Sequence, residues 1–169
     1  MNEAENTVVD IDPGHFRNVL GHYPTGVCVV TGCNADGLSS GLVVGSFTSV
    51  SLDPPLVAFS PDKGSTSWPQ VRECGHFCVN VIGADQLDLC RKFASKGRDK
   101  FEGVAHRLSP RGLPVLDNIV AYIECELEDE IDAGDHTIVL GRVLHLDVQR
   151  GEDPLLFFRG RYGRFTELG

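Results

Sequence analysis

The chain has 169 residues, of which 41% are hydrophobic and 23% are charged, values typical of a soluble globular protein. This length fits one domain with a sizeable core. The formal net charge of -9 argues against nucleic-acid binding, because contact with a phosphate backbone needs a basic footprint. The sequence has no apolar stretch of about 20 residues, so no membrane-spanning helix and no membrane partner are expected.

The cysteines and the start of the chain indicate a cytoplasmic protein. The six cysteines include no Cys-x-x-Cys pair. The acidic, polar opening at residues 1–5 lacks the basic start and apolar core of a secretory signal. Together these features predict reduced thiols in the cytoplasm. Cys74 and Cys78 flank a histidine, but a zinc site needs four ligands at closer spacing, so no metal is expected.

The first half of the chain predicts one helix followed by strands. Residues 1–11 are expected to form a flexible tail before a single domain at 12–169. Asp12 and Pro13 suit a helix N-terminus, and apolar residues recur with helical spacing from Phe16 to Tyr23. A hairpin turn is expected at 34–37 and a short helix at 65–74. The expected strands lie at 27–31, 38–44, 47–52, 56–60 and 77–82.

The second half predicts one more helix and longer strands. The amphipathic spacing of residues 87–94 predicts a helix, and the Gly-, Pro- and Arg-rich segment 98–118 predicts an ordered loop. Apolar residues alternate from Ile119 to Leu127, which is typical of a long, half-buried strand. A turn at Gly134 leads into a strand at 136–148, and two short strands are expected within 154–165.

Many strands with few helices predict a mainly β fold with peripheral helices, arranged as an antiparallel barrel. Two nucleotide-binding motifs are missing from the sequence: the Gly-x-Gly-x-x-Gly fingerprint after a strand, and the P-loop. A Gly-x-Ser-x-Gly string surrounds Ser39, but a nucleophile elbow needs a strand before it and a helix after it. Here a hairpin turn precedes Ser39 and an apolar run follows, so a serine hydrolase remains only a distant alternative.

The segment 41–57 carries the strongest local signal of function. Serine and threonine hydroxyls alternate or cluster with apolar side chains between Ser46 and Ser51, and Asp53-Pro-Pro ends the run. Hydroxyls, backbone amides and apolar groups suit a flat, amphipathic ring whose edge is hydrogen-bonded and whose face stays dry. A strand followed by a turn is the plain structural alternative.

Seven segments in series resemble the short-chain flavin reductases, which are the reductase partners of two-component flavin-dependent monooxygenases. The resemblance covers about residues 12–165. Gly45 departs from the family pattern, which often has a polar side chain there. The segments are 23–31 (YPTGVCVVT), 41–57, 61–68 (PDKGSTSW), 77–81 (FCVNV), 93–94 with 99–101 (FA and DKF), 134–141 (GDHTIVLG) and 154–162 (PLLFFRGRY).

The resemblance implies an FMN-binding split β-barrel with Greek-key antiparallel strands, acting as a homodimer. It implies that NADH, or else NADPH, transfers a hydride to FAD or FMN, and that the reduced flavin is supplied to a separate monooxygenase. The choice between the two flavins stays open. Two alternatives also stay open: a flavoprotein that retains FMN and reduces another substrate, and a non-catalytic flavin- or haem-binding protein.

The resemblance also implies roles for flavin-binding residues. Ser49, Val50 and Ser51 would contact the isoalloxazine edge, and Ser46 and Thr48 would support the ribityl side.

Further residues would serve the phosphate and the nicotinamide. Ser65 and Thr66 would bind the phosphate, and Lys100 with Arg98 would neutralise its charge. A basic phosphate pocket could also draw on the wider cluster of Arg91, Lys92, Lys96, Arg98 and Lys100.

Other roles have plain structural alternatives. His136 would lie beside the nicotinamide as the catalytic residue, or else be a hairpin residue. Tyr162 would contact the cofactor or pack in the barrel. Ser65 and Thr66 would also suit a helix N-terminus, and Trp68 is expected to anchor the core or a dimer. The apolar run at 42–44 is a further candidate for the dimer contact.

Overall fold

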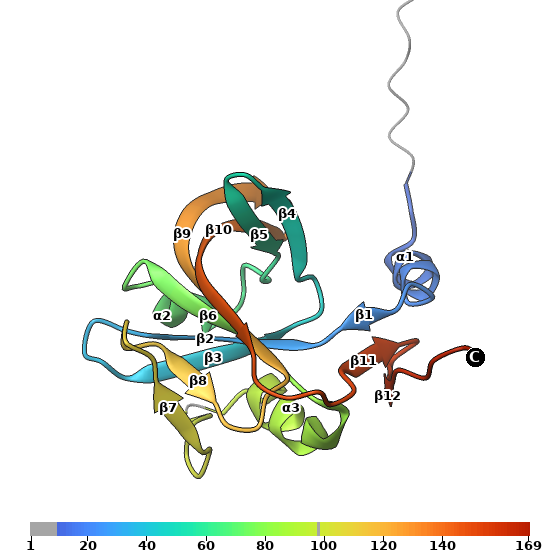
Figure 1. Ribbon diagram of the computed structural model, residues 1–169. Coiled ribbons are helices and arrows are strands. Elements are labelled where there is room, and N and C mark those ends of the chain that lie inside the picture. The colour runs from blue at the N-terminus through green and yellow to red at the C-terminus, as the bar shows by residue number, and fades with distance from the viewer. Residues whose placement is uncertain (1–9, 98) are drawn as a thin grey trace, which may run out of the picture.

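The computed structural model describes residues 10–97 and 99–169, which form a strongly curved antiparallel sheet with short helices around it (Figure 1). The helices are α1 (Pro13–Leu20), α2 (Trp68–Val71), the 3-10 helix η1 (Ala84–Gln86) and α3 (Leu87–Ala94). The strands are β1 (Thr25–Gly26), β2 (Cys28–Cys33), β3 (Ser39–Val44), β4 (Thr48–Leu52), β5 (Pro55–Phe59), β6 (His76–Val81), β7 (His106–Leu108), β8 (Pro114–Leu116), β9 (Ala121–Ala133), β10 (His136–Val148), β11 (Leu155–Phe158) and β12 (Arg161–Arg164).

The main sheet has seven strands in the order β3-β2-β6-β9-β10-β5-β4, so β3 and β4 are its two edges. Only residues 45–47 join these edges, and four Cα steps reach at most about 14 Å. A flat sheet of seven strands would hold its edges about 29 Å apart. The sheet must therefore curl until its edges approach each other without pairing. This geometry confirms the predicted mainly β, antiparallel fold and gives the barrel its split between β3 and β4.

The interior of the barrel is apolar and tightly packed. The rings of Phe59, Phe77 and Trp68 meet edge to face, with centroids 5.2 to 6.0 Å apart. Gly141 on β10 lies opposite Phe77, where a Cβ atom would approach the Phe77 ring to 2.5 Å. Close packing of these rings therefore requires a residue without a side chain at this point of β10.

A second apolar cluster covers the outer face of β2 and β6, beneath α3 and the β7–β8 hairpin. A buried polar group ties the hairpin down. Asn80 donates to Thr31 Oγ1 at 3.0 Å, and its Oδ1 accepts the backbone N–H of Leu116 at 2.9 Å. Because both polar side chains are fully buried and hydrogen-bonded, they fix β8 against the sheet at little desolvation cost.

The β7–β8 hairpin corrects two sequence-based expectations. The segment 98–118 was expected to be a loop, but His106–Leu108 pairs with Pro114–Leu116. Because the hairpin covers the outer face of β9, Tyr122 and Glu124 are buried there, and β9 is not half-exposed along its whole length. Glu124 accepts a hydrogen bond from Arg111 of the hairpin at 3.0 Å. The sequence did not predict this pairing, because both strands are short and the Pro- and Gly-rich turn between them gives the stronger local signal.

The other expected elements are confirmed within a few residues, with one shorter than predicted. The helix expected at 65–74 reaches only from Trp68 to Val71. Helix α1 begins as expected, with the backbone N–H of His15 donating to Asp12 Oδ2 at 2.7 Å. The N-terminal tail expected at 1–11 lies almost wholly outside the described residues. Among the described helices, none is long and apolar enough to cross a membrane.

A small layer projects from one side of the barrel (Figure 1). It consists of α1 and the three-stranded sheet β1-β11-β12. The apolar face of α1 is open: Phe16, Val19 and Leu20 are 51% to 54% exposed. Trp68 and Leu42, by contrast, are buried in the barrel interior. Trp68 is therefore a core residue, and neither side chain is exposed for a contact with a second copy.

Candidate active site

A cleft of about 870 Å³ opens beside the split in the barrel. It lies between the end of β3, the segment 60–67 that follows β5, the start of β10 and the residues after α3. We call this the main cleft. Its lining residues are Leu42, Val43, Val44, Gly45, Ser46, Ser60, Pro61, Asp62, Gly64, Ser65, Thr66, Ser67, Phe93, Ala94, Ser95, Lys96, Lys100 and His136.

The apolar part of the main cleft comes from β3 and α3. Val43 and Val44 lie at the end of β3, and Phe93 comes from the last turn of α3. The helix can lie this close because Gly41 has no side chain: a Cβ atom there would be 2.7 Å from the ring of Phe93. Phe93 is fully buried and Val44 nearly so, so Val43 is the partly exposed valine of this wall and Phe93 supports it from behind.

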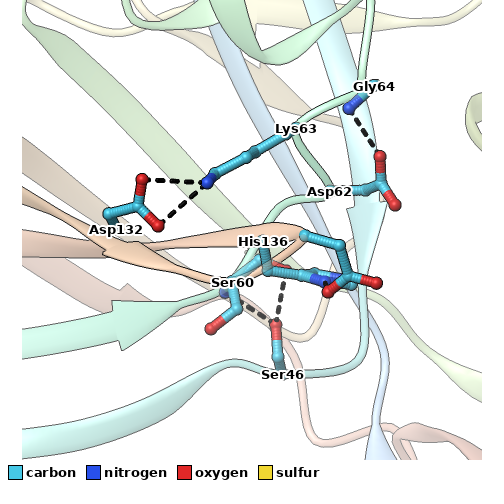
Figure 2. A network of polar contacts seen from close by, with 8 residues as sticks. Ser46, Ser60, Asp62, Lys63, Gly64, Asp132 and His136 are labelled. Atoms are coloured by element: carbon cyan, nitrogen blue, oxygen red, sulfur yellow. Dashed lines mark hydrogen bonds and ion pairs between the residues drawn. The ribbon is translucent and has the colours of Figure 1, made fainter.

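Hydrogen bonds hold the polar rim of the cleft in place (Figure 2). Ser46 Oγ accepts the backbone N–H of Ser60 at 2.8 Å, which joins the β3–β4 connection to the end of β5. Lys63 donates to both carboxylate oxygens of Asp132 on β9 at 2.9 Å. Asp62 accepts the backbone N–H of Gly64. These contacts fix the segment 60–67 from both sides.

Two lysines give the cleft its positive charge. Lys100 donates to Ser67 Oγ at 3.0 Å and to the backbone carbonyl of Gly41 at 3.3 Å. Partial burial lowers the pKa of Lys100 because it disfavours the ammonium form. Lys96 lines the same wall. Among the described residues, no carboxylate pairs with either lysine, so the cleft offers two cations to an anionic ligand.

Ser65 and Thr66, the residues predicted to bind a phosphate, both line the main cleft. Ser65 Oγ accepts the backbone N–H of Trp68 at 3.2 Å, but the N-cap residue of α2 is Ser67, whose side chain makes no capping hydrogen bond. Ser65 and Thr66 are therefore not the N-cap residues that the structural alternative expected, and both line the cleft.

His136 begins β10 at the rim of the main cleft (Figure 2). Its backbone forms a β-bridge with Asp62, and its Nδ1 lies 2.7 Å from Asp135 Oδ1. The hydrogen bond from His136 lowers the pKa of the Asp135 carboxyl, with the charge of the imidazolium form adding to the effect. The partner on Nδ1 fixes the ring orientation and leaves the other ring nitrogen for a ligand. The side chain is 43% exposed.

Five predicted site residues thus meet in the main cleft: Ser46, Ser65, Thr66, Lys100 and His136. The structure does not bring the others into it. Thr48, Ser49, Val50 and Ser51 lie on the edge strand β4 and line none of the cleft's described surface. Arg98 lies outside the described residues.

Tyr162 lies elsewhere, on β12, in a second groove of about 640 Å³. The Cys90 thiol of α3, together with partial burial, raises the pKa of Tyr162 to about 12. We call this second depression the C-terminal groove. Its lining residues are Pro24, Leu156, Phe158, Arg159, Arg161, Tyr162, Gly163 and Arg164.

Sequence reasoning missed Ser60, Ser67 and Phe93 as cleft-lining residues. Ser60 directly precedes the predicted phosphate-side segment 61–68 and Ser67 lies within it, so their place beside or inside that segment was the available signal. The wider basic cluster divides: Lys96 lines the cleft, whereas Arg91 pairs with Asp88 at 3.2 Å on the exposed face of α3. A run of basic residues on a helix cannot all face one site.

The chemistry of the main cleft suits a flat, partly apolar molecule that carries a phosphate. It combines an apolar surface, a rim of serine and threonine hydroxyls and two lysines. Asp62 and His136 are the titratable groups of the rim besides the lysines. The backbones of Asp62 and His136 form a β-bridge, which holds the rim in an arrangement suited to binding and orienting a ligand.

Comparison with known proteins supports a common origin along nearly the whole chain. Residues 20–166 match the flavin reductase like domain family. A flavin reductase of Pseudomonas putida is 55% identical over 158 residues, covering 94% of this chain and 93% of its own. The reductase subunit HsaB of a flavin-dependent monooxygenase from Rhodococcus jostii is 46% identical, covering 90% of this chain and 77% of its own.

Among solved structures, the NADH:FAD oxidoreductase SgcE6 of Streptomyces globisporus superimposes with a TM-score of 0.85. It is 35% identical, and the match covers 94% of this chain and 98% of that one. The family match, the sequence identities and the shared fold agree, and the chain belongs to the flavin reductase-like domain family.

Proposed function

We propose that this protein is an NAD(P)H:flavin oxidoreductase that supplies reduced FAD or FMN to a separate monooxygenase. The observation that carries the proposal is the donor set of the main cleft: an apolar surface and a hydroxyl rim beside two lysines that no described carboxylate neutralises. The names of its relatives support the same activity, since they include a reductase subunit of a flavin-dependent monooxygenase and an NADH:FAD oxidoreductase.

The residues of the cleft fit a phosphorylated flavin. The apolar face of an isoalloxazine ring suits Val43, which Phe93 supports from behind, and its polar edge suits the hydroxyls and amides of the rim. The burial that lowers the pKa of Lys100 is an energetic cost that a bound phosphate would offset. The volume of about 870 Å³ lies within the range of cofactor sites.

Roles for individual residues follow from their positions. Ser65, Thr66 and Lys100 hold the phosphate, and Ser46 ties the β3–β4 connection to the residue that follows β5. His136 orients the nicotinamide from the rim, with its own ring held by Asp135. Thr48, Ser49, Val50, Ser51 and Tyr162 stay predictions, because the described cleft does not include them.

A flavin supplies the redox chemistry when it is bound, since its ring accepts a hydride directly. The chain's own residues bind, orient and exclude water. Val43 gives the cleft an apolar wall, Lys100 anchors the phosphate, and the Asp135–His136 pair limits the orientation of the imidazole. No general acid–base pair is needed for such a transfer.

A homodimer is part of the proposal. The open apolar face of α1 and the partly exposed rings of Phe157, Phe158 and Tyr162 lie on one projecting layer. A second copy could cover this layer through an isologous contact. The cytoplasmic location expected from the sequence stays a prediction.

The test is steady-state oxidation of NADH and NADPH, with FAD, FMN and riboflavin supplied in turn. The proposal expects oxidation only when flavin is present, and faster turnover as free flavin is added. A protein that oxidises neither nicotinamide with any of the three flavins would overturn it. Purification with a yellow cofactor that resists dilution would favour the alternative of a retained FMN.

A further inference from the structure

A carboxylate directly precedes one of the two lysines of the main cleft. Asp99 comes before Lys100 in the segment between α3 and β7, and its side chain is exposed. A negative charge beside an anion site repels the ligand and weakens its binding. Asp99 is therefore expected to make another contribution, one that outweighs this repulsion.

The contacts of Asp99 lie in the backbone that follows it. Its Oδ1 accepts the backbone N–H of Phe101 at 3.1 Å and that of Glu102 at 3.0 Å. A carboxylate that accepts N–H groups two and three residues further on closes the chain into a local turn. Lys100 is enclosed by this turn, so the Asp99 side chain fixes the backbone from which the Lys100 side chain starts.

Two further contacts hold the same turn against the rest of the protein. Lys92 of α3 donates through Nζ to the backbone carbonyl of Glu102. The ring of Phe101 packs edge to face on the rings of Phe93 and His106, with centroids 5.1 and 4.9 Å away. The turn therefore has a defined position between the end of α3 and the start of β7.

The far end of the Lys100 side chain is fixed as well. Its ammonium group donates to Ser67 Oγ at 3.0 Å and to the backbone carbonyl of Gly41 at 3.3 Å. An ammonium group has three N–H donors, so these two bonds leave one donor for a ligand. Ordering a lysine costs rotamer entropy, and a side chain that is ordered beforehand spares the ligand this cost.

We propose that Asp99 is a positioning residue for Lys100: its turn presents the Lys100 ammonium group to the flavin phosphate in the main cleft. The inference rests on the proposed function and adds to it a residue that does not line the cleft. Asp99 acts through geometry, since its charge alone opposes the binding of an anion. In the motif at 99–101, Asp99 closes the turn, Lys100 supplies the charge and Phe101 anchors the turn.

Three substitutions of Asp99 separate the geometry of the acceptor from its charge. Equilibrium titration would measure the affinities for FMN and for riboflavin, which lacks the phosphate. Asp99→Ala removes the acceptor and should weaken FMN binding about 5- to 10-fold, while riboflavin binding changes by no more than about twofold. Asp99→Asn keeps an Oδ1 acceptor without the charge, so FMN affinity should stay within about threefold of the unmodified protein. Asp99→Glu keeps the charge but moves it one methylene away, and it should weaken FMN binding as Asp99→Ala does.

The effect of Asp99→Ala should depend on the presence of Lys100. When Lys100 is already replaced in Lys100→Met, adding Asp99→Ala should change FMN affinity by no more than about twofold, because the group that Asp99 positions is gone. Coupling of this kind distinguishes a positioning residue from one that only supports the fold.

Asn34→Ala is the matched control. Asn34 Oδ1 accepts the backbone N–H of Asp36 at 3.1 Å and that of Leu38 at 2.9 Å, in the turn between β2 and β3. Asn34 does not line the main cleft. Asn34→Ala breaks the same kind of turn, yet it should leave the affinities for FMN and riboflavin unchanged.

Four results would overturn the inference. Asp99→Ala could leave FMN affinity unchanged, or it could weaken FMN and riboflavin equally, which would indicate a general disturbance of the cleft. An equal loss of FMN affinity in Asp99→Ala and Asp99→Asn would assign the effect to charge. A full effect in the Lys100→Met background would show that Asp99 acts independently of Lys100.

If Asp99→Ala does not fold, the comparison of Asp99→Asn with Asp99→Glu decides, because only the first keeps the acceptor in place. The proposed function is tested separately, by NADH oxidation with the unmodified protein and added flavin. Its failure is therefore distinguishable from failure of the role of Asp99.

Discussion

The main cleft and the C-terminal groove have similar kinds of lining residues but differ in the contacts that support their walls. Both place cationic side chains next to apolar ones: Lys96 and Lys100 in the first, Arg159, Arg161 and Arg164 in the second. Hydrogen bonds join the segments of the cleft: Ser46 accepts the backbone N–H of Ser60, and Lys100 donates to Ser67. The groove lies on the projecting hairpin, whose rings are about 40% exposed.

The difference shows how to separate a ligand site from an interface. A site that must hold a small molecule in one orientation needs walls that are fixed before the ligand arrives. Ser46, Ser67 and Asp135 supply that support in the cleft. A surface with open apolar residues and less internal support suits coverage by another folded surface. The predictions below set substitutions in the cleft against matched ones in the projecting layer.

The largest effect is expected for His136→Ala. Loss of an orienting group can cost about 100-fold in rate without changing binding of the other reactant. We therefore expect slower flavin reduction and a higher KM for the nicotinamide, with flavin affinity nearly unchanged. Stopped-flow reduction and flavin titration would measure the two effects separately.

His22→Ala is the matched control, because the ring of His22 packs edge to face on Phe158 in the projecting layer. It should leave the reduction rate unchanged. Loss of flavin binding in His136→Ala would make this residue a flavin ligand, and no effect at all would make it only a hairpin residue.

Lys100→Met should weaken flavin binding by about 10- to 100-fold, since a hydrogen bond to a charged group contributes about 1.5–3 kcal/mol. Riboflavin, which has no phosphate, should lose little. Arg161→Met in the C-terminal groove should leave the affinity for every flavin unchanged. A uniform loss for FMN and riboflavin would contradict the phosphate role of Lys100.

Lys100→Met should also change the stability of the protein when no flavin is bound. The folded-state pKa of Lys100 is lowered, so the unfolded chain holds this proton more tightly. The group therefore destabilises the fold at pH values below its folded pKa, and this cost disappears as pH rises toward 10.5, its ordinary value. Lys100→Met removes this cost together with the bonds to Ser67 and Gly41. In thermal denaturation without flavin, the unmodified protein should therefore gain stability relative to Lys100→Met as pH rises toward 10.5, and a difference that does not change with pH would contradict the cost.

Ser46→Ala should have a moderate effect on both stability and binding. It removes the acceptor for the backbone N–H of Ser60 and so loosens the link between the β3–β4 connection and the end of β5. We expect a loss of about 1–2 kcal/mol in the free energy of unfolding, measured with denaturant, and a several-fold rise in the flavin Kd. Ser51→Ala on β4 is the comparison. An equal rise in the flavin Kd of Ser51→Ala would show that β4 belongs to the flavin site.

The smallest effect on folding is expected for Leu20→Glu on the open face of α1. Leu20 is 54% exposed, so the monomer should lose less than about 0.5 kcal/mol. Self-association should nevertheless weaken, as measured by light scattering at micromolar concentration. A dimer that persists in Leu20→Glu would place the interface elsewhere.

Periodicity and turn residues predicted most strands, because alternation in β9 and the Gly134 turn are strong local signals. The hairpin of β7 and β8 was not predictable in this way, since its pairing depends on Asn80 and Glu124, which are distant in sequence. The site followed the same rule. Ser65 and His136 were found through their motifs, whereas Phe93 enters the cleft only because Gly41 lets α3 approach β3.

The most direct test of the account is anaerobic mixing of the protein with FAD and NADH, followed through the loss of flavin absorbance. The account predicts rapid bleaching that requires the protein, release of the reduced flavin on dilution, and a much slower reaction with His136→Ala. Bleaching no faster than in a mixture without protein would contradict the central claim that this cleft brings a flavin and a nicotinamide together.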